Sequence, residues 1–299
     1  MAGNAPRVVV ITRETEYEML LARHATRGQA AFFLQQRGQS IDELDDRHQR
    51  FSQALHKIMA AIPQDWRRNR VQRAELDRFL FEPEDLVVAV GQDGLVANTA
   101  KYLSGQQVIG VNTDKDRFDG ILVPFSTDEA IKLLAPAMHG ETSTRSRTMV
   151  EATLDDGQRL LALNELFIGH RTHQSARYQI INSSGKEHQS SSGIIISTGT
   201  GATGWARSIH RSRKDQAALP NPEDKQLAYY VREAFPSVST GTDISSGTVD
   251  EKETLQVRSE MNEDGVIFGD GIEVDYLDFN WGRQVSVEVA RETLELVSG

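Results

Sequence analysis

The sequence lacks cysteine altogether and has no long apolar run. Without cysteine, disulfides, thiolate metal sites and a cysteine nucleophile are excluded. The longest apolar pieces, such as Val8–Ile11 and Leu86–Val90, are far shorter than the roughly 18 residues that a membrane-spanning helix needs. The opening MAGNAPRVVVITRETEYE turns acidic before any apolar segment forms, unlike a secretory signal or a transit peptide. We therefore expect a cytoplasmic protein without a membrane partner.

Positive charge is also scarce. The chain has 33 Lys and Arg against 43 Asp and Glu, which gives a net charge of −10. A protein that coats nucleic acid through bulk charge needs the opposite balance, so no nucleic-acid partner is expected. One basic patch, WRRNRVQR at 66–73, has Asp65 and Glu75 beside it and is interpreted as a solvated surface. Any anionic ligand must therefore be held by local geometry.

The first half of the 299 residues alternates between strand-like and helix-like segments. The runs Arg7–Thr12, Leu86–Val90 and Val108–Val111 are short and apolar, as buried strands are. One helix is predicted over about 42–62, and another follows the glycine turn after the second strand. The first of these has one apolar face, made of Leu44, His48, Phe51, Leu55, Ile58, Met59 and Ile62. This order predicts a Rossmann-like parallel α/β domain over residues 1–140.

The second half has a different character. After Gly140 the apolar runs are short, rich in β-formers and separated by turn residues, which predicts a β-rich domain over 141–299. Its last strand or tail is free to return to the first domain. A polar interval of about 212–246 is expected to contain one helical piece around Leu227–Ala234. The predicted fold class is thus α/β plus all-β.

The first candidate site is the pentapeptide GQDGL at Gly91–Leu95. Backbone N–H groups in a glycine turn that opens a helix form an anion site. An Asp at this place cannot bind phosphate, but it can accept a hydroxyl proton or hold a metal. The alternative is that Asp93 is only a helix N-cap. The pentapeptide alone leaves both interpretations open.

Two further candidates lie in the β-rich half. Asn164 and Glu165 are adjacent polar residues in an apolar setting, where they need partners such as ligand hydroxyls, or else form an ordinary exposed turn. The segment Ile196–Trp205 contains GTGATG, which formally matches the GxGxxG pattern of a dehydrogenase. The surrounding sequence is β-rich rather than βαβ, which favours a ligand-facing loop over that pattern. The pair His170 and His173 lacks an acidic third ligand, and no metal site is predicted.

Four motifs in this order resemble the NAD kinase family, and most closely its mitochondrial-type branch. They are VAVGQDGLV, VIGVNTDKDRFDG, ALNELFIG with RYQI, and SSGIIISTGTGATGW. The later VRS at 257–259 and GDG at 269–271 fit the family as well. The resemblance implies an N-terminal α/β domain and a C-terminal β-rich, sandwich-like domain. It also implies phosphorylation of the adenosine ribose 2′-hydroxyl of NAD by ATP with Mg²⁺, and a homo-oligomer, with a dimer favoured.

The resemblance also assigns roles to individual residues. Asp93 matches the catalytic Asp, which takes the proton of the 2′-hydroxyl. The phosphate and ATP loop corresponds to Gly91, Gln92 and Gly94. The residues that match the NAD-binding positions are Asn164, Glu165, Thr200, Thr203, Gly204, Trp205 and Ser208. No metal ligand is assigned.

The chain departs from the family at the glycine loop. The family has GGDGT, whereas Gln92 and Leu95 replace its second glycine and its threonine here. If position 92 requires a positive φ, a Gln there costs about 1 kcal/mol or more. Ser191 and Ser192 replace a Gly-Asp pair, a change that the mitochondrial-type branch shares. Gln92 and Leu95 motivate an alternative, a catalytically weak sensor that binds NAD or NADP.

A kinase acting on a lipid or sphingoid alcohol is a third interpretation, because those enzymes share a GGDG-type loop. The Asn-Glu pair and the VNTD segment at 111–114 argue against it.

Overall fold

The chain forms two compact units, residues 1–144 with 295–299 and residues 145–294. The computed structural model describes residues 5–115, 117, 119–213 and 219–298. One unit contains a parallel sheet with helices, and the other is built from antiparallel strands. The predicted fold class, α/β plus all-β, is confirmed.

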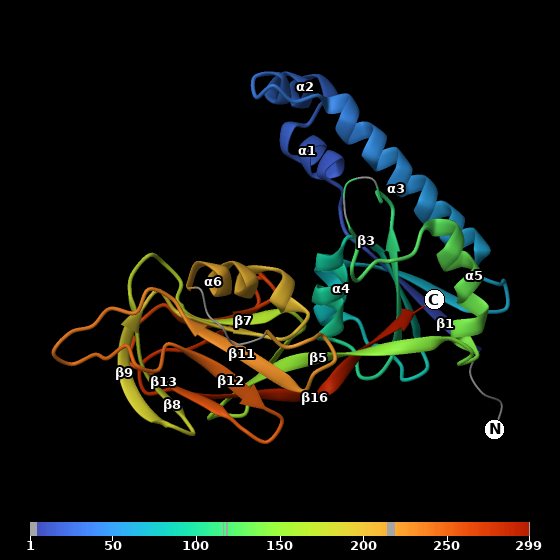
Figure 1. Ribbon diagram of the computed structural model, residues 1–299. Helices are drawn as coiled ribbons and strands as arrows, with labels where there is room; N and C mark the ends of the chain where they lie inside the picture. The colour runs from blue at the N-terminus through green and yellow to red at the C-terminus, as the bar shows by residue number, and fades with distance from the viewer. Residues whose placement is uncertain (1–4, 116, 118, 214–218, 299) are drawn as a thin grey trace. The chain divides into compact units, whose positions relative to one another are not determined.

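The N-terminal unit is a parallel sheet with crossover helices (Figure 1). Its strand order is β2-β1-β3-β4, and Glu295 and Leu296 of the last strand extend it by pairing in parallel with β4. After β1 the chain adds β2 at one edge of β1 and then β3 at its other edge. The strand order therefore reverses between β1 and β3. The elements are β1 (Arg7–Thr12), α1 (Glu16–His24), α2 (Arg27–Gln35), α3 (Ile41–Ala61), β2 (Arg67–Gln72), the 3₁₀ helix η1 (Arg73–Arg78), β3 (Leu86–Gly91), α4 (Asp93–Ala100), β4 (Gln107–Asn112) and α5 (Thr127–Met138).

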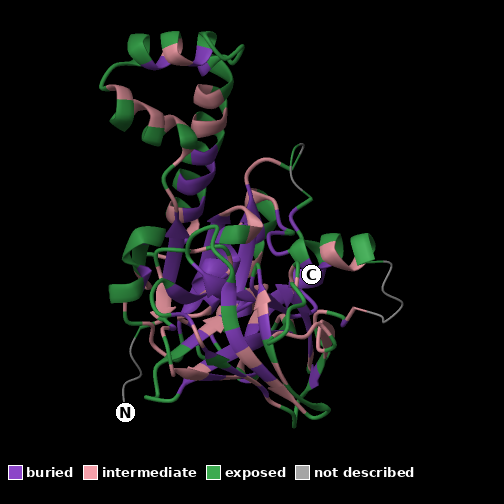
Figure 2. Ribbon diagram, turned by 90° about the vertical axis from the view of Figure 1, so that its left-hand side faces the viewer, coloured by how far each residue is buried: buried purple, intermediate pink, exposed green. Residues whose placement is uncertain are grey.

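Strands β1, β3 and β4 of this sheet are buried on both faces, which explains their continuous apolar sequences. Alternate strand residues such as Val88 and Val90 pack with Leu55 and Ile58 of α3 and with Leu134 of α5. The predicted apolar face of α3 therefore forms core. Figure 2 shows buried residues concentrated in the strands, while α1 has no buried residue. Helices α1 and α2 pack with the start of α3 in a small cluster of their own.

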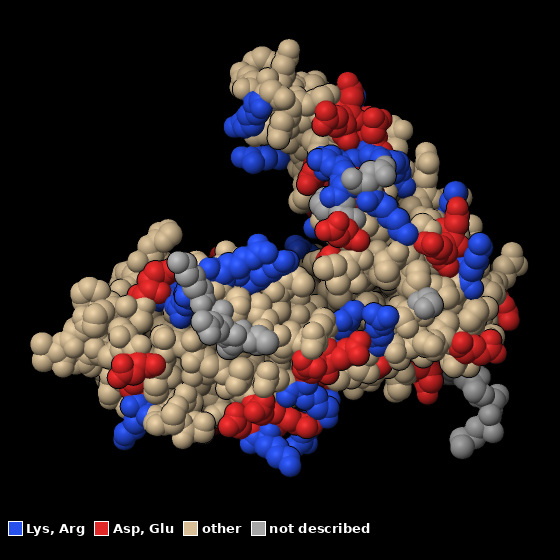
Figure 3. Space-filling model, viewed as in Figure 1, with Lys and Arg blue, Asp and Glu red and all other residues tan. Residues whose placement is uncertain are grey.

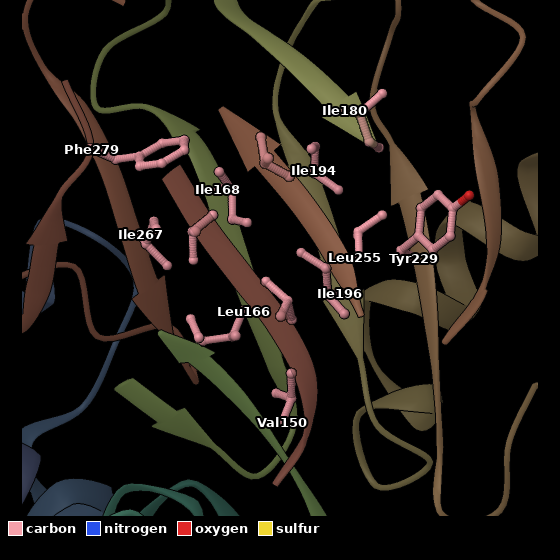
Figure 4. Packing of buried hydrophobic residues seen from close by; sticks show 14 of the residues in the cluster. Val150, Leu166, Ile168, Ile180, Ile194, Ile196, Tyr229, Leu255, Ile267 and Phe279 are labelled. Carbon is pink, nitrogen blue, oxygen red and sulfur yellow. The ribbon is translucent and has the colours of Figure 1, made fainter. Parts of the chain in front are cut away.

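The C-terminal unit contains two antiparallel layers. One is the six-stranded sheet β12-β11-β10-β7-β14-β15, and the other contains β16-β13-β8-β9 with β5 and β6. Figure 4 shows the apolar core of this unit, including Ile168, Ile194 and Ile267. The elements are β5 (Ser143–Leu154), β6 (Arg159–Ala162), β7 (Glu165–His170), β8 (Ala176–Asn182), β9 (Gly185–Ser191), β10 (Ile194–Ser197), the 3₁₀ helix η2 (Gly201–Thr203), α6 (Trp205–Arg213), β11 (Gln226–Val231), β12 (Ser246–Asp250), β13 (Leu255–Ser259), β14 (Gly265–Gly269), β15 (Tyr276–Asp278) and β16 (Gln284–Ser298).

The helical piece expected around Leu227–Ala234 is wrong, because Gln226–Val231 forms strand β11. Tyr229 belongs to the large core cluster, whereas Tyr230 packs against α6. A strand that is buried on both faces shows no polar alternation, so its period cannot be distinguished from that of a helix. Residues 214–218 of the same polar interval lie outside the described residues.

No helix in the described part of the chain is both long and apolar enough to cross a membrane. On the face shown in Figure 3, basic and acidic side chains are interspersed.

Candidate functional site

The glycine loop is a short connection between strand β3 and helix α4. Gly91 ends the strand with φ 154°, a value in the region that favours glycine, whereas Gln92 is extended with φ −118° and ψ 166°. The positive φ therefore falls on Gly91, and Gln92 carries no backbone strain. A Gln at position 92 therefore does not have the backbone cost of a positive φ.

Asp93 is the first residue of α4, and Gln92 occupies the N-cap position without a side-chain cap bond. The Asp93 carboxylate is held from outside its own helix, because Oδ1 accepts a 2.8 Å hydrogen bond from the backbone N–H of Leu122. A carboxylate accepts several hydrogen bonds, so one bond leaves capacity for a ligand hydroxyl. Asp93 is thus placed at a glycine turn as a fixed acceptor and not as the N-cap residue.

The two departures from the family loop both have partners in the N-terminal unit. Gln92 Oε1 accepts a 2.6 Å hydrogen bond from the Arg13 guanidinium, which follows the neighbouring strand β1. Leu95 is 1% exposed, and its Cδ2 lies 3.4 Å from the position that a Cβ on Gly91 would take. Leu95 therefore packs in the core, and Gln92 connects the loop to a cation.

The VNTD segment begins in the last two residues of β4 and continues beyond its carboxyl end. Asn112 is buried, and its Oδ1 accepts a 2.9 Å hydrogen bond from the backbone N–H of Asp114. Gly120 comes so close that a Cβ there would lie 2.7 Å from Asn112 Nδ2. Asp116 and Phe118 of this motif lie outside the described residues.

Asn164 and Glu165 lie at the start of β7 in the C-terminal unit, beside Asp270. The Asp270 carboxylate accepts hydrogen bonds from the backbone N–H groups of Leu163, at 2.9 Å, and Asn164, at 2.6 Å. The Asp270 N–H donates to the Glu165 carbonyl at 3.0 Å. Asp270 is therefore a positioning residue for the pair. The sequence feature that points to Asp270 is the GDG at 269–271, and the family motifs assign no role to this residue.

The Glu165 carboxyl group is placed where its charge is disfavoured. Burial and, secondly, the negative charge of Asp270 raise the pKa of Glu165 to about 7. Strand alternation puts Glu165 on the same face of the sheet as Phe167, which is in contact with the ring of Trp205. A carboxylate with a pKa near neutrality and a polar amide beside it is typical of a functional site rather than of an exposed turn.

The Thr/Gly loop, residues 198–204, is hydrogen-bonded to the backbone of Leu163 and Asn164. Thr198 donates from its backbone N–H to the Asn164 carbonyl at 2.9 Å, and from its Oγ1 to the Leu163 carbonyl at 2.5 Å. Thr200 is buried, and its Oγ1 has no hydrogen-bond partner among the described residues. A buried hydroxyl without a partner is costly, so Thr200 is the loop residue best suited to a ligand.

The loop follows β10, which pairs antiparallel with both β7 and β11. A dinucleotide fingerprint of the dehydrogenase type follows a parallel strand in a βαβ unit. The setting of GTGATG is therefore not that of a dehydrogenase fingerprint, and a ligand-facing loop stays the prediction.

Gly201→Ala is expected to destabilise the protein by about 1–3 kcal/mol through overpacking. A Cβ on Gly201 would lie 2.2 Å from the Asn164 carbonyl oxygen and 2.7 Å from Ser197 Oγ. The loop or the Asn164–Glu165 pair must therefore move. Urea unfolding measures the effect. Gly28→Ala on α2 is the control, because a Cβ there meets nothing within 4 Å; equal unfolding free energies for both variants would contradict the expectation.

The remaining candidates lie at the start of α6. The Trp205 ring is parallel to that of Phe167, with centroids 6.3 Å apart, and the Arg232 guanidinium lies 5.0 Å from the Trp205 centroid. Trp205 is 38% exposed, so part of the ring is open to a ligand. Thr203, Gly204 and Ser208 are also exposed. The structure places Thr200 in the Thr/Gly loop, which is hydrogen-bonded to the backbone of Asn164 next to Glu165. Ser208 lies farther along α6, after Trp205.

Comparison with known proteins points to one family. The chain is 33% identical over 129 residues to an NAD kinase of Chlorobium phaeobacteroides, and 27% identical over 256 residues to the human protein named NAD kinase 2, mitochondrial. These alignments cover 42% and 69% of this chain, and the chain spans only 44% and 58% of the length of the two relatives. No family model matches the sequence. The matches confirm the resemblance to the NAD kinase family and its mitochondrial-type branch.

The fold also resembles that of a solved member. The crystal structure of yeast NADH kinase complexed with NADH has a TM-score of 0.64 to this chain at 14% identity. The match covers 99% of this chain and 84% of the yeast chain. At this identity the likeness shows a shared two-domain fold.

Proposed function

We propose that the protein is an NAD kinase, which transfers a phosphoryl group from ATP to the adenosine ribose 2′-hydroxyl of NAD and forms NADP. The observation that carries the proposal is Asp93, a carboxylate fixed by the Leu122 N–H at a glycine turn that opens a helix. The C-terminal unit of the same chain holds the Asn-Glu pair and the Thr/Gly loop of the family. The similarity to proteins named NAD kinase supports this combination.

In the proposed reaction Asp93 is the general base. The 2′-hydroxyl oxygen attacks the γ-phosphorus of ATP as its proton passes to the Asp93 carboxylate. The bond from the γ-phosphorus to the β–γ bridging oxygen breaks, and ADP leaves with the negative charge. Gly91 and Gly94 let the loop backbone approach the phosphates, since neither carries a Cβ.

The groups of the C-terminal unit bind NAD in this proposal. The Asn164 amide donates and accepts hydrogen bonds at the hydroxyls of the adenosine ribose, and the ionised Glu165 carboxylate accepts them. The Thr200 hydroxyl, which has no partner among the described residues, supplies a further bond to the dinucleotide. Trp205 offers its open ring for stacking, with Thr203, Gly204 and Ser208 beside it in the chain.

The finer parts of the proposal follow from the resemblance. Mg²⁺ enters as its complex with ATP, because Mg²⁺ is commonly bound through substrate phosphates and one or two carboxylates. The chain is proposed to form a homo-oligomer, with a dimer favoured, and to act in the cytoplasm.

The test is an assay of NADP formation. Purified protein is incubated with NAD, ATP and Mg²⁺, and NADP is detected with an NADP-specific dehydrogenase. We expect NADP in the complete mixture and none without ATP, and a parallel reaction with NADH compares the two dinucleotides. If calorimetry shows NAD binding but no NADP forms with any nucleoside triphosphate, the protein is a dinucleotide-binding sensor instead. A labelled lipid product would establish the lipid kinase alternative.

A further inference from the structure

Helices α1 and α2 form a helical hairpin, residues 16–37, that stands away from the sheet of the N-terminal unit (Figure 2). The hairpin packs with the start of α3 around a small apolar cluster that contains Ala30, Leu34 and Ile41. No residue of α1 is buried, and α2 buries only Ala30 and Leu34. Most of the surface of the hairpin is therefore open to solvent and is not used to build the sheet.

The hairpin differs in charge from the rest of the protein. Residues 19–41 contain three arginines and no Asp or Glu, whereas the whole chain has a net charge of −10. Arg27 is paired with Asp42 of α3 at 2.6 Å. Arg23 and Arg37 form no ion pair with any residue that the structure describes. The positive charge of the hairpin is therefore only partly compensated within the chain.

The two arginines without a carboxylate partner lie against one aromatic ring. Arg37 Cζ is 3.7 Å from the centroid of the Phe33 ring, and Arg23 Cζ is 5.7 Å from it. Arg37 also donates from Nη1 to the Phe33 carbonyl at 3.1 Å. Contact with a ring restricts where a guanidinium lies but leaves most of its N–H donors free for an anion. Phe33 thus holds two cations at the surface of the hairpin.

A shallow hollow lies beside these cations, between the end of α1 and α2. Its lining includes Arg23, His24, Gly28, Phe32 and Phe33. Phe32 is 63% exposed, and His24 Nε2 is buried without a hydrogen-bond partner among the described residues. Most of the lining is exposed, so a small molecule would bury little of its own surface here. A protein segment can cover the hollow and both helices together.

We propose that the hairpin is a docking surface for an acidic segment of a partner protein. An apolar side chain of the partner lies in the hollow beside Phe32, and its carboxylates lie at Arg23 and Arg37. Aromatic residues and arginines are the residue types that contribute most to binding at protein interfaces. The inference is independent of the proposed kinase function.

Charge complementarity argues for this occupant. Complementary charges across an interface steer the encounter and select the partner, and the hairpin presents two cations that lack carboxylates. An anionic lipid surface fits less well, because it repels a chain with a net charge of −10. A hollow also accepts a protruding side chain, whereas insertion into a membrane needs a protruding apolar tip.

The test immobilises the full chain and selects binders from a displayed library of random peptides. We expect the selected peptides to combine Asp or Glu with a large apolar residue. One of them is then synthesised, and its binding is measured by fluorescence anisotropy. Phe32→Ser should weaken binding about 10-fold or more, as expected for a central anchor of an interface. Gly28→Glu should also weaken it, because the new carboxylate lies in the hollow and competes for Arg23.

Each variant has a matched control. Gly28→Ala changes the glycine without adding charge, and a Cβ at position 28 meets nothing within 4 Å. Leu80→Ser removes another exposed apolar side chain of the same unit. Both controls should bind the peptide like the unmodified protein. Thermal unfolding verifies that all four variants are folded, which we expect because Phe32 is exposed and an acidic residue is favourable in the first turn of a helix.

Three results overturn the inference. If the library yields no acidic peptide, or if the peptide binds Phe32→Ser and Gly28→Glu as tightly as the unmodified protein, the hairpin does not dock an acidic segment. If sedimentation shows self-association that these two variants abolish, the occupant is a second copy of the chain. Binding to phosphatidylserine vesicles without binding to acidic peptides would show that the occupant is a lipid surface.

Discussion

In the proposed reaction, Asp93→Asn should lower kcat for NADP formation by about 10²–10⁴-fold, the usual contribution of a general base. The amide of Asn cannot take the proton of the 2′-hydroxyl at neutral pH. Its oxygen can still accept the hydrogen bond from the Leu122 N–H, which Asp93 Oδ1 accepts at 2.8 Å. The fold is therefore expected to persist, and the loss should appear in kcat while the KM for NAD changes little. Steady-state assays with varied NAD and saturating ATP measure both constants.

The control for Asp93 is Asp128→Asn. Asp128 also lies in the first turn of a helix of the parallel unit, but it is exposed on α5. Its substitution removes the same charge near a helix N-terminus and should leave kcat unchanged. An Asp93→Asn variant that turns over as fast as Asp128→Asn would show that the glycine-loop carboxylate is structural.

Glu165→Gln should make the protein more stable at pH 8 by up to about 3 kcal/mol, because a tenfold change in an acid dissociation constant corresponds to about 1.4 kcal/mol. Burial and the charge of Asp270 raise the pKa of Glu165 from 4.5 to about 7 in the folded protein. Between these two values the folded protein holds a proton that the unfolded chain has released. The free energy of unfolding therefore falls as pH rises from about 4.5 to 7, and the Gln variant lacks this fall. Urea unfolding at pH 5 and pH 8 measures the difference.

The same titration should govern ligand binding. In the proposed function only the ionised Glu165 carboxylate accepts hydrogen bonds from two ribose hydroxyls, so NAD affinity should rise as pH increases through 7. In Glu165→Gln the affinity should be lower and independent of pH in this range. Glu263→Gln, at an exposed position of the C-terminal unit, is the control for loss of one charge. A stability difference between wild type and Glu165→Gln that is equal at pH 5 and pH 8 would exclude a buried, titrating Glu165.

The sequence predicts most of the N-terminal unit because strands β1, β3 and β4 are buried on both faces. The runs at β1, β3 and β4 are continuously apolar, and the apolar face of α3 has a clear helical period. Strand β2 was not predicted, since Arg67–Gln72 has the composition of a basic patch. It lies at the edge of the sheet and pairs with β1 through its backbone, so most of its side chains are exposed and polar. An edge strand needs little apolar pattern.

The sequence predicts only those residues of the candidate site that belong to local motifs. Asp93 and the Asn164–Glu165 pair are recognisable because each belongs to a short family motif. The role of Asp270 depends on the pairing of β14 with β7, and the bond from Arg13 to Gln92 depends on β1 lying beside β3. Both contacts join segments that are far apart in the chain. No local pattern encodes them, so the sequence alone makes the Gln92 substitution look like a defect.

The pairing of residues 295–296 with β4 has a consequence for synthesis of the protein on the ribosome. Residues 1–144 emerge first, but their sheet lacks the strand that covers β4 until Glu295 and Leu296 have been made. The N-terminal unit is therefore the first to be translated and the last to be completed. Until then β4 presents an open sheet edge, the kind of surface on which nascent chains depend on chaperones.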